Sequence, residues 1–439
     1  MRDLPCDVIR DLLPGYVDGL TSEASNDAVR SHLETCADCR AVLSAMRAPE
    51  PERTKTEEKE LDFLRKTNRS SRRRALWAGF GVLALALCAL CVYVFAVGQK
   101  TLPDTLLCDV AVSDTALSVK AAPMGGAAVG NVKFSEADGV VTVSTRTVNR
   151  SPLHRGAAEE TYTAASPIRQ VVVNDRVVWD EGAAIAPFAA KLYATRHAYL
   201  GSAWENVQTA NALFLGAVKH SLDTESRPYT WHVELWETEH EQSEGLENFT
   251  EAELTAMGDV MKCAAYPMLA LVQNCDQVSF DCLCEGEARS VVFTAEDATA
   301  FFGRDIKDCY DSPRLFAALV QRLGLSGAVT LQKWSFADRM ITIINGTDTP
   351  LREMGIAFYD AAGNITSSGG AANADGSPLA YGDRLDYDIS DFTGRGITAR
   401  LSVTTEDGKT FEIDRDIPVN VDQMLTLRGS PETGFTLEP

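Results

Sequence analysis

Residues 75–97 read ALWAGFGVLALALCALCVYVFAV, a run of 23 residues without a charge, Asn, Gln or Pro. An α-helix rises about 1.5 Å per residue, so the run reaches roughly 34 Å, enough to cross a hydrocarbon core of about 30 Å. The run follows 74 other residues, whereas the apolar region of a cleaved secretory peptide is shorter and terminal. We therefore expect residues 75–97 to form one transmembrane helix that stays in the protein and contacts the lipid bilayer.

The charges on the two sides of this run differ. Basic residues crowd positions 65–74, whereas the other side offers Lys100 before the acidic Asp104 and Asp109. The positive-inside rule predicts a single-pass protein of the cell membrane, with residues 1–74 cytoplasmic and the later residues extracytoplasmic. Residues 1–74 hold 14 Lys and Arg and 14 Asp and Glu, so the whole net charge of −21 falls on the later residues. Such an acidic surface repels nucleic acids, and we expect no direct nucleic-acid binding.

Four residues near the N-terminus have the spacing of metal ligands. Cys6 precedes an H-x3-C-x2-C cluster of His32, Cys36 and Cys39. Thiolate and imidazole ligands in this number suit structural Zn²⁺ in a tetrahedral site, and four protein ligands leave no open position for a catalytic water. The alternative is three free thiols and a surface histidine. Apolar spacing predicts a helix within residues 7–20, a second one capped by Ser22 or Ser25, and a third from Ala37.

The stretch CDVIRDLLPGYVDGLTSEASNDAVRSHLETCADCRAVLSAM, residues 6–46, resembles the zinc-finger domain of bacterial anti-sigma factors. The resemblance rests on the ligand spacing and on the segment DLLPGYVDG. It implies a helical domain that binds zinc through Cys6, His32, Cys36 and Cys39, and a sigma factor or another cytoplasmic regulator as partner. Many anti-sigma factors continue into a long amphipathic helix that clasps the sigma factor. Residues 48–74 instead read as a charged linker and a basic juxtamembrane segment, with Leu61, Phe63 and Leu64 as apolar anchors.

The remaining chain predicts two further domains. Residues 98–325 mix alternating strand-like runs with helical runs, which indicates an α+β domain. Within it, VNDRVVW predicts a hairpin with an Asn-Asp turn and an inward Trp179. Residues 326–428 alternate in short runs between Gly, Asn and Asp turns, which is typical of a β-sandwich, the immunoglobulin type included. We expect residues 429–439 to be a flexible tail.

Two stretches of the α+β region, KCAAYPMLALVQNCDQVSFDC and TAEDATAFFGRDIKDCYDSPRLFAALV, resemble an uncharacterised extracytoplasmic domain. That domain often follows this zinc finger in Gram-positive bacteria. No activity is known for it, so the resemblance implies architecture alone. The expected fold class is thus multi-domain: a small all-α zinc-binding domain over residues 1–47, one transmembrane helix, an α+β domain and an all-β sandwich.

The extracytoplasmic region gives no sign of an enzyme. It contains no G-x-S-x-G, H-E-x-x-H, P-loop or G-x-G-x-x-G motif. A solvated acidic hairpin accounts for the stretch that holds His232 and His240. Six cysteines lie in this region, at positions 108, 263, 275, 282, 284 and 309. Their number permits disulfides, free buried thiols or, less readily, a metal site, and their pairing is not deducible.

These patterns favour a signal-transducing regulator. An exterior domain would sense an unknown ligand, envelope state or partner, and the tethered zinc domain would bind a cytoplasmic partner. Oxidation of Cys36 or Cys39 would eject zinc and melt the domain, which is a thiol-stress variant of the same function. The alternative is an envelope structural or adhesion protein whose zinc finger is only an anchor domain.

Overall fold

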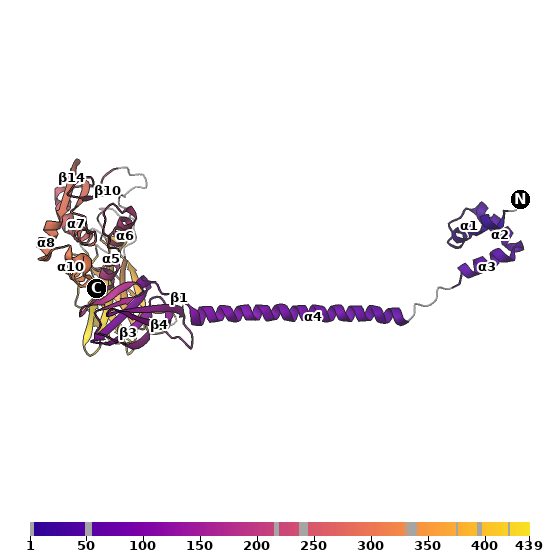
Figure 1. The fold of residues 1–439 in the computed structure, drawn as a ribbon, viewed down its shortest axis with the longest axis horizontal. Helices are drawn as coiled ribbons and strands as arrows, with labels where there is room; N and C mark the ends of the chain where they lie inside the picture. The colour runs from indigo at the N-terminus through magenta and orange to yellow at the C-terminus, as the bar shows by residue number, and fades with distance from the viewer. Residues whose placement is uncertain are drawn as a thin grey trace. The chain divides into compact units, whose positions relative to one another are not determined.

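A computed structural model describes residues 4–48, 55–214, 219–236, 245–329, 331, 340–374, 376–392, 397–419 and 422–439, without the side chains of residues 55–71 and 391. The chain divides into two compact units, Met1–Leu87 and Cys88–Pro439. Figure 1 shows short helices at the N-terminus, a long helix, and strands and helices after it. This multi-domain α+β architecture with a sheet-rich C-terminal part confirms the expected fold class.

Three short helices form the N-terminal domain, as the sequence predicts. They are α1 (Cys6–Val17), α2 (Glu23–Thr35) and α3 (Ala37–Met46). Ser22 occupies the N-cap position of α2. Gly19 adopts the left-handed conformation (φ 72°) that ends α1, where Leu20 N donates to Gly15 O over 2.8 Å. Ile9 and Leu13 face the small core, whereas Leu20 from the same apolar stripe is 82% exposed.

Residues 55–74 of the charged segment are helical, whereas the sequence predicts a linker over residues 48–74. Helix α4 spans Lys55–Val92 and continues as a π-helical turn, η1 (Tyr93–Val97). Lys, Glu, Leu and Arg are good helix formers, and extending an existing helix needs no new nucleus. The side chains of Leu61, Phe63 and Leu64 lie outside the described side chains, so their role as anchors stays a prediction.

One helical stretch of 26 residues, Arg72–Val97, is long and apolar enough to cross a membrane. None of the residues in its most apolar window is buried. The stretch contains the whole run of residues 75–97 that the sequence indicates and starts three positions earlier, at the basic residues.

Residues 99–184 form two β-sheets around a first core. One sheet has the order β1-β5-β7-β8-β9 with β4 beside β5, and the other has the order β2-β3-β6. Their strands are β1 (Gln99–Lys100), β2 (Leu106–Ser113), β3 (Ala116–Pro123), β4 (Ala127–Ala137), β5 (Val140–Asn149), β6 (Ala158–Thr163), β7 (Gln170–Val173), β8 (Arg176–Asp180) and β9 (Ala183–Ala184). Alternate residues such as Leu117, Val141 and Val171 point into the core between the sheets.

The hairpin predicted around VNDRVVW is confirmed. Asn174 and Asp175 have φ of 47° and 71° between β7 and β8, as the tightest hairpin turns require. The Asn174 amide is buried, where its oxygen accepts from Thr145 N over 2.9 Å and its nitrogen donates to Thr145 Oγ1 over 2.8 Å. Trp179 is half-buried and packs against the first core, as predicted.

A second core follows within the region that the sequence assigned to a single α+β domain, residues 98–325. All of its described helices come after Ala186: α5 (Pro187–Tyr193), α6 (Ala203–Leu213), α7 (Glu251–Leu271), α8 (Ala295–Phe302), α9 (Asp308–Asp311) and α10 (Pro313–Arg322). They pack with a mixed sheet of β10 (Lys219–Asp223), β11 (Thr230–Glu234), β12 (Asn248–Phe249), β13 (Gln277–Cys284) and β14 (Glu287–Thr294). The region predicted as one domain thus contains a strand-rich part and a helix-on-sheet part with separate hydrophobic cores. The predicted bounds of the domain stay a prediction.

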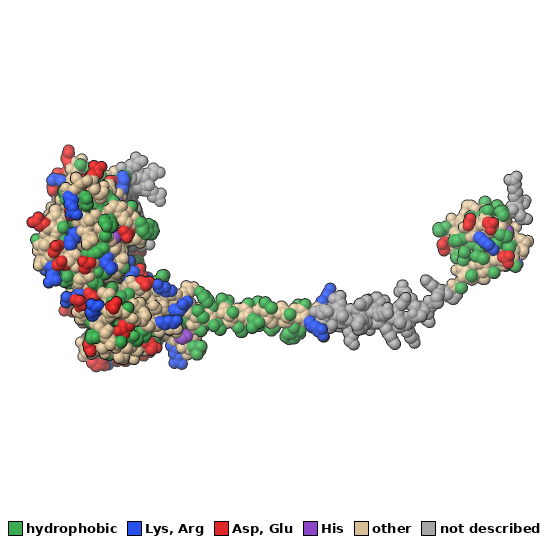
Figure 2. All heavy atoms as spheres, viewed as in Figure 1, with side chains coloured by type: hydrophobic (Ala, Val, Ile, Leu, Met, Phe, Trp, Pro, Cys, Tyr) green, Lys and Arg blue, Asp and Glu red, His purple; other side chains and the backbone are tan. Residues whose placement is uncertain are grey.

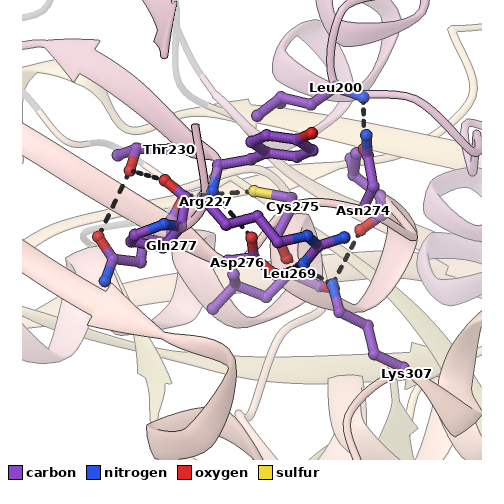
Figure 3. Close-up of polar contacts among 12 residues, drawn as sticks. Leu200, Arg227, Thr230, Leu269, Asn274, Cys275, Asp276, Gln277 and Lys307 are labelled. Atoms are coloured by element: carbon purple, nitrogen blue, oxygen red, sulfur yellow. Dashed lines mark hydrogen bonds and ion pairs between the residues drawn. The ribbon is translucent and has the colours of Figure 1, made fainter. Parts of the chain in front are cut away.

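One half-buried lysine, Lys307, donates hydrogen bonds at the end of α7. Lys307 Nζ donates to the carbonyl oxygens of Leu269, Val272 and Cys275 over 2.6, 2.9 and 2.6 Å. Figure 3 shows the Lys307 side chain reaching this turn, with Asp276 of the same turn bound to Arg227 (2.7 Å). Three donated hydrogen bonds require the ammonium form. They supply donors to carbonyls at and just after a helix C-terminus, where Val272 O also accepts from Cys275 N over 3.2 Å. Burial nevertheless lowers the pKa of Lys307.

The C-terminal sandwich is confirmed, but the flexible tail is wrong. Two sheets, in the orders β18-β15-β22-β23 and β17-β16-β19-β20 with β21 beside β19, enclose a third core. Their strands are β15 (Met340–Asn345), β16 (Leu351–Tyr359), β17 (Ile365–Ala371), β18 (Arg384–Asp388), β19 (Thr398–Thr405), β20 (Thr410–Glu412), β21 (Ile417–Pro418), β22 (Gln423–Ser430) and β23 (Gly434–Glu438). Strand β23 lies in the segment predicted to be a tail and pairs with β22 because Phe435 and Leu437 alternate into the core.

The first sheet is hydrogen-bonded directly to the last turn of the apolar helix, with no linker between them. Gly98 N donates to Tyr93 O over 2.7 Å, and Arg146 of β5 donates from Nε to Val97 O and from Nη2 to Gly98 O over 2.9 and 3.0 Å. Gly98 has φ of 65°, and a Cβ there would meet Thr147 O at 2.3 Å. Only glycine fits so close an approach. The next two residues already pair with β5 as β1.

Candidate metal centre

Helices α1, α2 and α3 bring the four predicted ligands together at their ends. Cys6 is the first residue of α1, His32 lies in the last turn of α2, Cys36 separates α2 from α3, and Cys39 lies in the first turn of α3. Cys36 N donates to His32 O over 2.9 Å. This bond closes the turn between α2 and α3, so the local spacing read in the sequence places His32, Cys36 and Cys39 beside each other.

The separations of the ligand atoms fit a tetrahedral zinc ion. The ligand atoms of the four residues all lie within 4.8 Å of one another. Cys6 Sγ is 3.8 Å from Cys36 Sγ and 3.5 Å from His32 Nε2. With Zn–S of about 2.3 Å and Zn–N of about 2.0 Å, a tetrahedron requires roughly 3.8 Å between two sulfurs and roughly 3.5 Å between sulfur and nitrogen. The donors therefore suit Zn²⁺ held by four protein ligands.

The thiols of this cluster have unequal acidity. A hydrogen bond from the backbone N–H of Cys39 is the main cause that lowers the pKa of Cys36 to about 7. Burial, with a smaller contribution from Cys36, raises the pKa of Cys39 to about 11. Because zinc binds thiolates, an ion that enters at neutral pH must displace the proton of Cys39. Zinc would supply structural cross-linking here, and its affinity should rise with pH.

The apolar core of this domain is very small. Its buried members are Ile9, Leu13, Val29, Leu33 and Cys39. A single core of this size does not offset the chain entropy lost by ordering about 40 residues. Cys39 belongs both to the core and to the ligand set, which links packing to the metal. We therefore expect the metal to be part of the folding of the domain.

The six cysteines that follow the apolar helix do not form a second metal centre among the described residues. The Cys6, His32, Cys36 and Cys39 cluster is the only group of three or more candidate ligands in the part of the chain that the structure describes. All eleven cysteines are free thiols. Burial raises the pKa of Cys275 and Cys282 to about 11 and that of Cys108 and Cys309 to about 12. These thiols are therefore protonated at neutral pH and poorly reactive.

One of the two histidines of the acidic stretch, His232, lies among the described residues. His232 in β11 contacts Asp281 of β13 through Nδ1 and Oδ2 at 3.0 Å, and Asp281 also accepts from Ser279 Oγ over 2.8 Å. These contacts occupy the carboxylate with protein groups. His240 falls outside the described residues, so the predicted acidic hairpin stays a prediction.

The fold and the site thus define a zinc-finger domain followed by a helix able to cross a membrane. Residues 6–40 match the protein-family model described as "Putative zinc-finger". No curated protein matches the chain. A solved structure described as "NMR structure of the protein from Eubacterium rectale" is similar, with 14% identity and a TM-score of 0.17 over 23% of this chain and 86% of that one. So low a TM-score carries no argument about the fold.

Proposed function

We propose that this protein is a single-pass membrane regulator of the anti-sigma-factor type. Its zinc-stabilised N-terminal domain binds a cytoplasmic partner, a sigma factor, and its sheet-rich part responds to an extracytoplasmic signal. The observation that carries the proposal is the Cys6, His32, Cys36 and Cys39 cluster, whose geometry fits zinc and whose residues match the family model.

The surface of the zinc domain supports a protein partner. Val8, Leu20 and Met46 are 40%, 82% and 43% exposed. A small domain with few buried residues that still exposes large apolar side chains offers them for contact with another protein. The same domain adjoins a helix long and apolar enough to span a membrane, which would hold the partner at the membrane.

A pull-down from solubilised membranes tests the proposal on the full chain. We expect the wild type to carry one zinc per chain and to capture a sigma factor, and the Cys36→Ser/Cys39→Ser variant to lose both. The matched control is Cys88→Ser/Cys91→Ser, which removes two closely spaced thiols from the apolar helix and should retain both. Zinc content is measured by mass spectrometry on the same samples.

A surface variant separates partner binding from folding. Leu20→Asp alters an exposed side chain just after α1, so it should keep the zinc and lose at least tenfold in capture of the partner. Zinc retained in the wild type without any captured sigma factor would contradict the sigma-factor part and favour an envelope structural protein with an anchor domain. Absence of zinc from the wild type would contradict the metal centre itself.

A further inference from the structure

The loop after β5 lies on the helix side of the sheet-rich unit. Gln99 pairs with Thr147 in antiparallel register, so the chain that continues from Thr147 to Asn149 runs back past Gly98 toward the last turn of the helix. The close approach of Gly98 to Val148 agrees, since a Cβ on Gly98 would meet Val148 Cγ1 at 2.6 Å. The loop of residues 150–155, here called the tip loop, therefore begins beside the point where the apolar helix ends.

A tight turn in the tip loop holds the side chain of Leu153 in solvent. Ser151 and His154 exchange two backbone hydrogen bonds, from Ser151 N to His154 O (2.8 Å) and from His154 N to Ser151 O (3.1 Å). Ser151 Oγ also accepts from Leu153 N and His154 N over 3.3 and 3.2 Å. This tight turn holds Leu153 out at 80% exposure. Leu102, which follows β1, is also exposed, at 67%.

Cations surround these leucines. Arg150 and Arg155 flank the tip of the loop, and Lys100 and Arg146 lie on the paired strands β1 and β5; all four are exposed. Figure 2 shows Lys and Arg side chains gathered where the sheet-rich unit adjoins the helix, whereas acidic and basic side chains mix over the rest of the visible face. The concentration is unusual because the chain carries a net charge of −21.

Nearby carboxylates neutralise part of this positive charge. Lys100 pairs with Asp175 at 2.6 Å, and Arg150 contacts Asp383 at 3.3 Å and Ala127 O at 3.3 Å. Asp104 is paired with Arg176. The Lys100 contact is exposed and the Arg150 contacts are long, and such contacts exchange readily with other anions. Among the described residues, the exposed Arg155 side chain forms no hydrogen bond or ion pair.

We propose that the tip loop docks on the surface of the lipid bilayer beside the helix, with Leu153 in the interfacial region and the arginines on phosphates of anionic phospholipids. An exposed apolar residue between cations is the chemistry that binds such an interface, because the apolar side chain leaves water while the cations stay among the headgroups. Arg guanidinium also matches phosphate geometry. The proposal rests on the proposed membrane span, which brings the loop to the bilayer.

The test places a fluorescent reporter on the tip in the full-length protein. The Leu153→Trp variant is reconstituted into vesicles of phosphatidylcholine, with and without phosphatidylglycerol, that contain a lipid with a nitroxide on its headgroup. Relative to the wild type, the added tryptophan should emit at shorter wavelength and lose emission to the nitroxide, more strongly with phosphatidylglycerol. Adding Arg150→Gln/Arg155→Gln to Leu153→Trp should remove the additional quenching that phosphatidylglycerol causes. Adding Arg400→Gln, which breaks an exposed pair with Asp416, should leave that quenching unchanged.

Two controls distinguish docking of the tip loop from the membrane span on which it rests. Ile365→Trp reports from another exposed apolar position, 62% exposed on β17, and should show no added quenching. Native Trp77 lies in the apolar helix, so quenching by lipids brominated in their chains tests the span itself, and Trp77→Phe should remove it. The docking proposal is overturned if Trp77 is quenched but the Leu153→Trp variant shows no added quenching. It is also overturned if the Leu153→Trp and Ile365→Trp variants are quenched equally. An unquenched Trp77 overturns the span on which it rests.

Discussion

Removal of zinc is expected to unfold α1, α2 and α3 while the sheet-rich part of the chain stays folded. The metal would join residues at the ends of all three helices, and besides the ligand Cys39 four buried residues form the core. Structural zinc contributes about 10–16 kcal/mol of apparent binding free energy in small zinc-finger peptides at pH 7, far more than a core of this size supplies. Backbone amides of residues 6–46 should therefore exchange with deuterium almost as fast as in an unfolded chain.

The measurement is hydrogen–deuterium exchange with a strong zinc chelator, followed by re-addition of zinc. Buried strands such as β13 and β22 provide an internal control, since their protection should not change. The Cys36→Ser/Cys39→Ser variant should behave like the chelated wild type, and the Cys88→Ser/Cys91→Ser variant like the zinc-bound one. Full protection of α1–α3 after complete loss of zinc would contradict the role of the metal in folding.

Replacement of Lys307 by Met should strongly destabilise the helix-on-sheet part. The change removes a donor from the carbonyl oxygens of Leu269, Val272 and Cys275. Val272 O still accepts from Cys275 N over 3.2 Å, so the other two carbonyls lose the donor they depend on. Each buried polar group left without a partner costs about 1–3 kcal/mol, and water that enters the site recovers part of this. We expect a loss of about 3 kcal/mol in unfolding free energy, which corresponds to roughly hundredfold faster exchange of the slowest amides of α7 and β13.

An exposed lysine serves as the matched control for this prediction. Lys133→Met in β4 removes the same charge at an exposed position and should leave exchange in α7 unchanged. Lys307→Gln keeps two N–H donors, so its effect should lie between those of Lys307→Met and the wild type. Equal exchange rates in Lys307→Met and Lys133→Met would show that the three carbonyls find other donors.

The parts of the structure that could be predicted depend on residues close in sequence. His32, Cys36 and Cys39 meet because they are three and four positions apart at a helix junction, and the apolar run of residues 75–97 needs no tertiary information. The Asn174-Asp175 hairpin was likewise predictable, since its turn demands residues that tolerate positive φ. Cys6 was assigned through the pattern it completes with the other three ligands.

The features that were missed depend on distant contacts. Lys307 reads as an ordinary surface lysine, because its partners lie 32–38 positions earlier in the chain. In the sequence, the residues of strand β23 resemble a polar tail, and their order follows from pairing with β22. Leu153 belongs to RSPLHR, whose apolar residue between cations was a visible signal, but its place beside the helix end follows only from the register of β1 on β5.

The junction at Gly98 determines how movement can pass between the helix and the sheets. Arg146 and the β1–β5 pairing bind the final turn directly to the first sheet, with no linker residues between them. A rotation or tilt of β5 would therefore act directly on the last residues of the helix. Under the proposed function, a signal received by the sheets would reach the helix through these direct hydrogen bonds and not through a flexible linker.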